Sequence, residues 1–107
     1  MSETLRRIMD LVRRGEVRIS AHGYDEMAED DILAREAIEG LEAGVVVEDY
    51  PEYQKGPCVL VLQRDRNGGP VHTVWGIPNG TQTPAVLVTA YRPDATRWTD
   101  DFTRRKP

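Results

Sequence analysis

The hydrophobic period of the chain changes at Gly44, and this change limits the folds that the sequence can adopt. Before Gly44 most apolar residues recur with the spacing of amphipathic helices, and after it they alternate as in strands. The predicted helices span residues 3–14, 21–29 and 32–43, and the predicted strands span residues 17–19, 45–50, 58–64, 71–77 and 86–91. Helices followed by sequential strands predict an α+β fold, with N-terminal helices on one face of a mainly antiparallel sheet of four to five strands.

The two strands predicted within residues 71–91 bring polar side chains together. Pro78, Asn79, Gly80 and Pro84 interrupt any regular element between them, so the strands are expected to be neighbours. If they pair antiparallel in the register that their alternation favours, His72 shares a face of the sheet with Thr89 and Tyr91. An imidazole, a hydroxyl and a phenol then lie on one patch.

The length of 107 residues fits one domain, residues 1–107, with one core. Residues 1–15 form the N-terminal helix, and residues 94–107 are expected to be a partly frayed tail with Trp98 as its anchor. The core is expected to join apolar residues of the helices to apolar residues of the strands: Leu5, Ile8, Val12, Ile38 and Leu41 on Val59, Val61, Trp75 and Leu87.

Charge is unevenly distributed along the chain. The net charge is −4, but residues 21–53 hold eleven acidic residues and one basic residue, Arg35. An acidic chain is a poor general binder of nucleic acid, although the basic ends leave room for a local basic face. No segment approaches the about 20 apolar residues of a membrane helix, and the first residues lack a signal-peptide core. The sequence therefore predicts a cytoplasmic protein with no membrane association.

Few residues remain for catalysis. Cys58 is the only cysteine and lies in an apolar run, so neither a disulfide nor a cysteine zinc cluster is expected. Two histidines without a converging carboxylate pair do not predict a metal site. The sequence also contains no phosphate-binding glycine motif, so a nucleotide cofactor is not expected. The expectation is a site without metal or cofactor. Each histidine could equally have a structural role, His22 in a helix cap and His72 in a cross-strand pair.

Histidine, tyrosine, threonine and arginine beside a sheet suit metal-free cleavage of RNA. The reaction needs a base for the 2′-hydroxyl proton, an acid for the leaving oxygen and a cation for the phosphorane. His22 or His72 could act as base or acid, and Tyr91 as acid or hydrogen-bond donor. The expected substrate-binding residues are Arg18, Arg92, Thr89 and Trp98, with Tyr53 or Trp75 as further stacking surfaces.

Several short motifs in order resemble the DUF4258 family. They are Ile19-Ser20-Ala21-His22, Met27, Ile32, Val71-His72, Val88-Thr89-Ala90-Tyr91, Pro93 and Trp98. The family looks like the RelE/ParE toxin superfamily, which implies a compact α+β scaffold, a ribonuclease activity on RNA or the ribosome, and an antitoxin protein as partner. The chain departs from the family where Glu26 and Asp30 stand at positions that often hold arginine.

Two functions stay open from the sequence. The first is a toxin-like domain that binds or cleaves RNA through His22, His72 and Tyr91. The second is a non-catalytic protein-interaction module of the same fold, which would use the acidic surface of the second and third helices. The strand at residues 45–50 could also pair across a homodimer. A cleft shared by both histidines favours the first function, and burial of the rings in separate hydrogen bonds counts against it.

Overall fold

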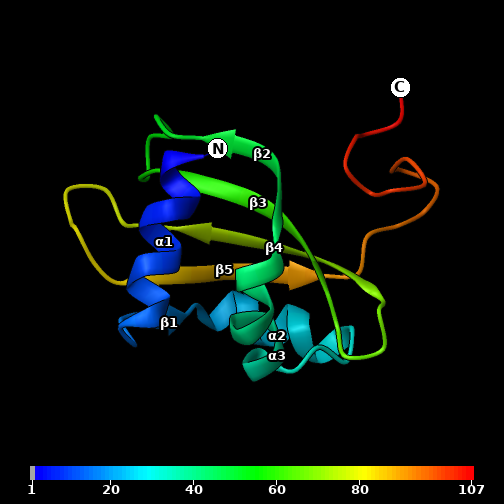
Figure 1. Cartoon of the computed structure of the whole chain (residues 1–107), viewed down its shortest axis with the longest axis horizontal. Helices are drawn as coiled ribbons and strands as arrows, with labels where there is room; N and C mark the ends of the chain where they lie inside the picture. Colours follow the sequence, from blue (N-terminus) through cyan, green and yellow to red (C-terminus); the bar gives the residue numbers. More distant parts are fainter. Residues whose placement is uncertain (1) are drawn as a thin grey trace.

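The computed structural model describes residues 2–107 and has three α-helices and a five-stranded sheet (Figure 1). The elements in chain order are α1 (Glu3–Arg13), β1 (Val17–Ile19), α2 (Ala21–Glu29), α3 (Ala34–Glu39), the 3₁₀ turn η1 (Gly40–Ala43), β2 (Val45–Tyr50), β3 (Cys58–Arg64), β4 (Pro70–Gly76) and β5 (Ala85–Tyr91). The predicted α+β class is confirmed.

The sheet is mixed, in the order β1-β5-β4-β3-β2. The four long strands form an antiparallel meander, as the short turns between them predict. β1 pairs parallel with β5, from Val17 opposite Ala85 to Ile19 opposite Leu87. The first strand of the chain therefore lies beside the last, and β2 lies at the other edge.

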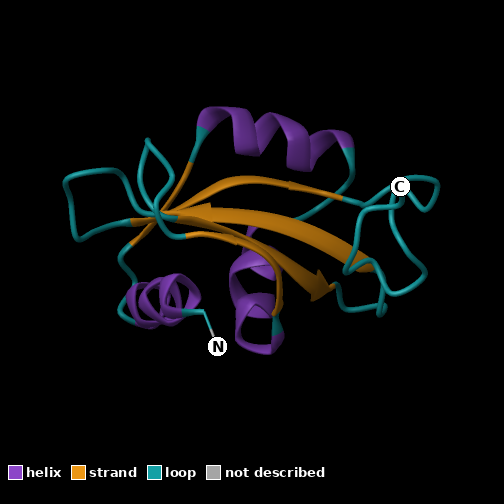
Figure 2. Ribbon diagram, turned by 90° about the horizontal axis from the view of Figure 1, so that it is seen from above, coloured by secondary structure: helices purple, strands orange, loops and turns teal. Residues whose placement is uncertain are grey.

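The helices do not all cover the same face, which corrects the prediction that they do. Figure 2 shows α1 and α3 on one side of the sheet and α2 on the other. Ser20 fixes this placement, because its Oγ accepts from Gly23 N (2.9 Å) and donates to the carbonyl of Val88 (2.7 Å). A Cβ on Gly23 would lie 2.8 Å from that same oxygen, so only glycine lets α2 approach β5 this closely.

The main core lies between the sheet and the helices. Leu5, Ile8 and Leu41 are buried against Val59, Val61, Trp75 and Leu87, whereas Val12 and Ile38 are only partly buried. Full burial of one such side chain contributes about 1.5–3 kcal/mol to folding. The residues predicted for the core therefore hold the helices to the sheet.

The third helix is shorter than the predicted span of residues 32–43. Asp31 has a positive φ of 54°, and Ile32 N donates to the carbonyl of Met27 at 2.8 Å. These two features fold Ile32 back onto the end of α2, so helix α3 begins only at Ala34. After Glu39 the chain tightens into η1.

The C-terminal segment is tied to the sheet instead of frayed. Trp98 is buried, with a bridge to Arg105, and Arg105 Nε donates to Glu48 of β2 at 2.8 Å. Lys106 also bonds to the carbonyl of Ala95. In Figure 1 this segment leaves the end of β5 and folds back at the same end of the molecule. Within residues 2–107, no helix has the length and apolar character needed to cross a membrane.

Candidate functional site

The sheet face that is turned away from α1 carries the predicted polar patch. His72 lies opposite Tyr91, and Val74 lies opposite Thr89. Paired residues in antiparallel strands project on the same face, so the prediction that His72, Thr89 and Tyr91 share a face is confirmed. A bulge between Val74 and Trp75 shifts the register nearer the start of β5.

The ring of His72 is fully enclosed within this patch. Its Nε2 lies 2.8 Å from the carbonyl oxygen of Phe102, and its Nδ1 lies 3.4 Å from the hydroxyl of Tyr91. A carbonyl can only accept, so the neutral ring carries its hydrogen on Nε2 and accepts from Tyr91 on Nδ1. Desolvation by burial lowers the pKa of His72, which favours this neutral form.

The C-terminal segment supplies the cover over His72. Trp98 meets the imidazole edge-on at 4.4 Å between ring centroids, and the guanidinium of Arg105 lies 4.8 Å from the centre of the Trp98 ring. Arg105 in turn binds Glu48, and the hydrogen bond from Arg105 lowers the pKa of that carboxyl. We name Trp98, Phe102, Arg105 and Glu48 the tail clamp.

Phe102 of the tail clamp occupies one ring nitrogen of His72 and Tyr91 of β5 occupies the other, and the residue is 0% exposed. In this arrangement a substrate cannot touch the ring, so the role predicted for His72 as a catalytic base or acid is not supported. Tyr91 and Trp98, two further residues predicted for the site, both contact the His72 ring.

His22 is arranged differently and is open to solvent. It lies in the first turn of α2 with a side chain that is 73% exposed, and its Nε2 lies 2.7 Å from Oε1 of Glu26. The same oxygen accepts a short hydrogen bond from the hydroxyl of Thr89. A carboxylate can only accept, so Nε2 carries the hydrogen in neutral His22 and the lone pair is on Nδ1. We name His22, Glu26 and Thr89 the imidazole relay.

A groove of about 420 Å³ lies on the same face of the sheet as Thr89 of the imidazole relay. Val74, Val86 and Val88 are among the apolar residues of the groove, and Thr89 follows Val88 opposite Val74. Its polar lining comes from Arg18 of β1 and from Tyr53 and Lys55 of the loop before β3. Arg18 and Lys55 make no ion pair within residues 2–107, and both are exposed, as is Tyr53.

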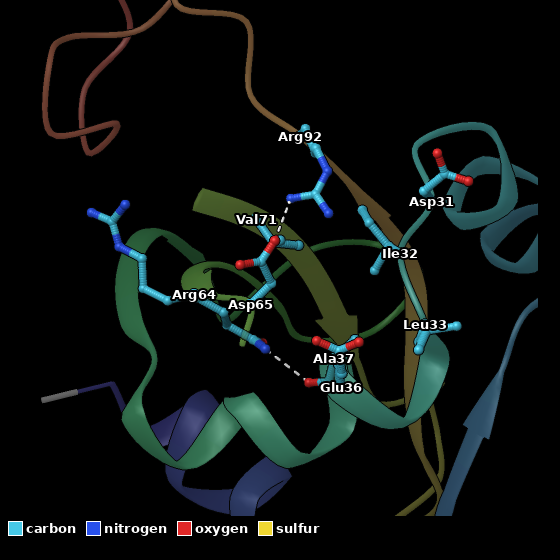
Figure 3. Close-up of a pocket in the computed structure, with 10 residues that line it drawn as sticks. Asp31, Ile32, Leu33, Glu36, Ala37, Arg64, Asp65, Val71 and Arg92 are labelled. Carbon is cyan, nitrogen blue, oxygen red and sulfur yellow. Dashed lines mark hydrogen bonds and ion pairs between the residues drawn. The ribbon is translucent and has the colours of Figure 1, made fainter. Parts of the chain in front are cut away.

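Arg92 is held by acidic residues instead of lining this groove. Figure 3 shows its guanidinium directed at Asp65, 2.9 Å from Oδ2. Its Nε donates to the carbonyl of Asp30, and its backbone N–H donates to the Asp30 carboxylate at 2.8 Å. The adjacent pocket has room for only about 20 Å³. Of the two cations predicted to meet a substrate, Arg18 lies at the groove and Arg92 does not.

Comparison with known proteins adds one observation. The family model described as a domain of unknown function, DUF4258, matches residues 19–92. The chain belongs to the DUF4258 family. The match includes α2, the whole sheet except the start of β1, and the imidazole relay. No curated protein and no solved structure matches the chain.

The two departures from the DUF4258 pattern both have contacts. Glu26 holds His22 and Thr89, and Asp30 holds the backbone and side chain of Arg92. Both carboxylates are therefore engaged by donors of the protein itself.

Glu26 is the functional residue that sequence reasoning missed. Its spacing of i, i+4 from His22 was a usable signal, because residues four apart meet on one side of a helix. Lys55 gave no such signal, since it lies in an irregular loop. Within residues 2–107, no group of three His, Cys, Asp or Glu side chains could hold a metal ion. Cys58 borders the groove, and desolvation raises the pKa of its thiol.

Proposed function

We propose that this protein is a RelE/ParE-like domain that binds single-stranded RNA along the groove and cleaves it with His22 as general base. The observation that carries the proposal is the hydrogen bond from His22 to Glu26 on the side of the sheet that also holds a groove with two exposed cations. The order of N-terminal helices and a largely antiparallel sheet supports the relationship to that toxin superfamily.

The chemistry follows from the imidazole relay. Glu26 fixes the tautomer and the orientation of His22, which leaves Nδ1 to take the proton of a ribose 2′-hydroxyl. The 2′-oxygen then attacks phosphorus, the bond from phosphorus to the 5′-oxygen breaks, and the leaving oxygen takes a proton from water. The step needs no metal.

The groove supplies the recognition of RNA. Arg18 and Lys55 have no acidic partner within the described chain and are suited to bind the phosphates on either side of the cleaved bond. Tyr53, which is 52% exposed, offers a ring on which an unpaired base stacks. The apolar residues of the groove would contact the face of the ribose or base, so an unstructured strand fits better than a duplex.

A cleavage assay tests the proposal. Total RNA and purified ribosomes carrying a messenger are incubated with the protein in EDTA, and the products are separated by electrophoresis. Wild-type protein cleaves in at least one of the two, and His22→Ala lowers the rate by at least about 100-fold. Intact RNA in both assays would overturn the enzymatic part of the proposal.

The two lysines of the chain, Lys55 and Lys106, provide a matched pair for RNA binding. Lys106 bonds to the carbonyl of Ala95, away from the groove. Lys55→Ala is expected to weaken RNA binding and to reduce its salt dependence, because one phosphate contact is lost. Lys106→Ala removes the same charge and leaves both unchanged. Equal effects of the two variants would indicate binding to net charge alone.

A second function, protein interaction without catalysis, is favoured by a different surface. The residues of α2 that face away from the imidazole relay, such as Tyr24, Met27 and Ala28, are apolar, and an apolar surface offers no contacts to phosphate. An antitoxin is the partner that the family resemblance implies. The two functions would use different surfaces, which lie on different sides of α2.

A further inference from the structure

A second groove, of about 400 Å³, separates α2 from the beginning of α3. Tyr24, Met27 and Ala28 line it from α2, and Ile32, Leu33 and Ala34 line it from the segment that enters α3. Tyr24 and Leu33 are 55% and 54% exposed, among the most exposed large apolar side chains of the described chain. An exposed apolar surface of this kind is typical of an interaction site.

The groove is built on fixed elements. Met27 and Ile32 are 2% and 8% exposed and form its floor, and they are joined by the hydrogen bond from Ile32 N to the Met27 carbonyl. The turn at Asp31 sets Leu33 apart from the end of α2. The walls, Tyr24 and Leu33, are therefore open while the floor is packed into the protein, so a ligand would meet a preformed surface.

The rim of the groove is negatively charged. Asp31 lines the groove and Asp25 follows Tyr24 of its wall; both are exposed, and neither forms an ion pair with another described residue. Other acidic residues of the chain, such as Glu42 and Glu48, are each bound by an arginine. The carboxylates at the rim remain uncompensated, and phosphate would be repelled there.

This groove is separate from the RNA-binding groove. Successive residues of a helix turn by about 100°, so Tyr24 and His22 project from nearly opposite sides of α2. His22 and Glu26 are directed to Thr89, whereas Tyr24 and Ala28 line the second groove. A ligand on one side leaves the other side accessible.

We propose that the second groove binds a basic amphipathic helix of a partner protein. Two or more apolar side chains at helical spacing would enter between Tyr24 and Leu33, and flanking lysines or arginines would pair with Asp25 and Asp31. A groove formed between helices suits an inserted helix, whose apolar residues recur at i, i+3, i+4 and i+7. The proposal does not depend on the cleavage of RNA.

Selection from a displayed library of helical peptides tests the proposal. The library varies both the apolar and the charged positions, and it is selected on the wild-type protein. Peptides with an apolar stripe and net positive charge are expected to be enriched, and their binding is expected to weaken as salt is added. Failure to enrich any peptide, or enrichment of neutral or acidic ones, would overturn the proposal.

Variants of the protein locate the bound peptide. Leu33→Ser and Asp25→Lys are each expected to weaken the selected peptides by about tenfold or more. Matched controls on strand β2 are Val45→Ser, which also changes an exposed apolar residue, and Asp49→Lys, which also reverses an exposed charge. Circular dichroism confirms that each variant is folded.

Two further outcomes count against the second groove. Unchanged affinity in the Leu33 and charge-reversal variants would place the peptide elsewhere. Displacement of the peptide by single-stranded RNA would show that it occupies the groove of Arg18 and Lys55. Simultaneous binding of peptide and RNA supports separate sites. If the protein bound the peptide but did not cleave RNA, the proposed cleavage would fail and the peptide site would stand.

Discussion

The Nε2 atom of His72 lies 2.8 Å from the carbonyl oxygen of Phe102, thirty residues further along the chain. This bond joins the third strand of the meander to the C-terminal segment. Next to Phe102, the carboxylate of Asp101 accepts hydrogen bonds from the hydroxyls of Thr99 and Thr103. These bonds, the one from Thr99 most of all, lower the pKa of Asp101 to about 2. The turn that presents the carbonyl is thus fixed by its own side chains.

The burial of neutral His72 predicts a dependence of stability on pH. Because the pKa of His72 is lowered in the folded state, the unfolded chain takes up the proton first as pH falls below about 6.5. The free energy of unfolding should therefore decrease from pH 7.5 to pH 5.5. In His72→Gln this decrease should be smaller, as measured by urea unfolding at both pH values.

The control for that experiment is His22→Gln, which removes the exposed histidine. It should retain the dependence of the wild-type protein. The paired carboxyl of Glu48 acts with the same sign but at lower pH, since its lowered pKa contributes stability that is lost below about 4.3. A pH dependence that is the same in wild type and His72→Gln would contradict a neutral buried imidazole.

Removal of the Trp98 ring should release the C-terminal segment. Trp98→Ala takes away a ring that is 4% exposed, together with its contacts to His72 and Arg105, and should cost about 3 kcal/mol of stability. Trp98→Phe keeps an aromatic ring there and should cost less. Hydrogen exchange at C2 of the His72 ring, read by mass spectrometry, should accelerate in the alanine variant and much less in the phenylalanine variant.

Glu26 should act as a positioning residue in the proposed cleavage of RNA. Glu26→Gln can still bond to Thr89 but no longer offers His22 a carboxylate, and the rate should fall by about 10- to 100-fold because the imidazole loses its fixed orientation. RNA affinity should stay the same. Glu29→Gln removes a charge from the same helix and should alter neither quantity. An equal loss of rate in both variants would point to charge alone.

Gly23 should tolerate no side chain. In Gly23→Ala the new Cβ would meet the Val88 carbonyl oxygen at 2.8 Å and the Ser20 Oγ at 3.0 Å, so helix α2 must move away from β5. The expected loss is about 1–3 kcal/mol in denaturant unfolding. Glu29→Ala, in the same helix but exposed, should change stability little. Stability equal to wild type in Gly23→Ala would mean that α2 packs less closely than described.

The sequence predicts most accurately the elements whose ends are set by residues next to them in the chain. Helix α2 begins after Ser20, strand β2 ends before Pro51, and β3 begins after Pro57, as expected. The shared face of His72 and Tyr91 was also predictable, because alternation along two adjacent strands fixes it. Each of these features depends on residues that are near one another in the sequence.

The features that sequence reasoning missed depend on distant contacts. The parallel pairing of Val17–Ile19 with β5 leaves no periodic pattern in three residues, and it is this pairing that carries α2 to the opposite side of the sheet. The burial of His72 depends on Trp98 and Phe102, which lie in a segment without helix or strand periodicity. The contact of His22 with Glu26 is the exception among the missed features, because the spacing of four residues in a helix was enough to predict it.

The pairing of β1 with β5 determines when, during translation, the sheet and the imidazole relay can form. The edge of Val17–Ile19 has no partner until Ala85–Leu87 has left the translation machinery. Helix α2 is fixed to Val88 and Thr89, so His22 reaches its working position only then. A nascent chain that ends before β5 would therefore carry every side chain of α2 and still lack Thr89 of the imidazole relay, and the proposed activity would begin only with the nearly finished polypeptide.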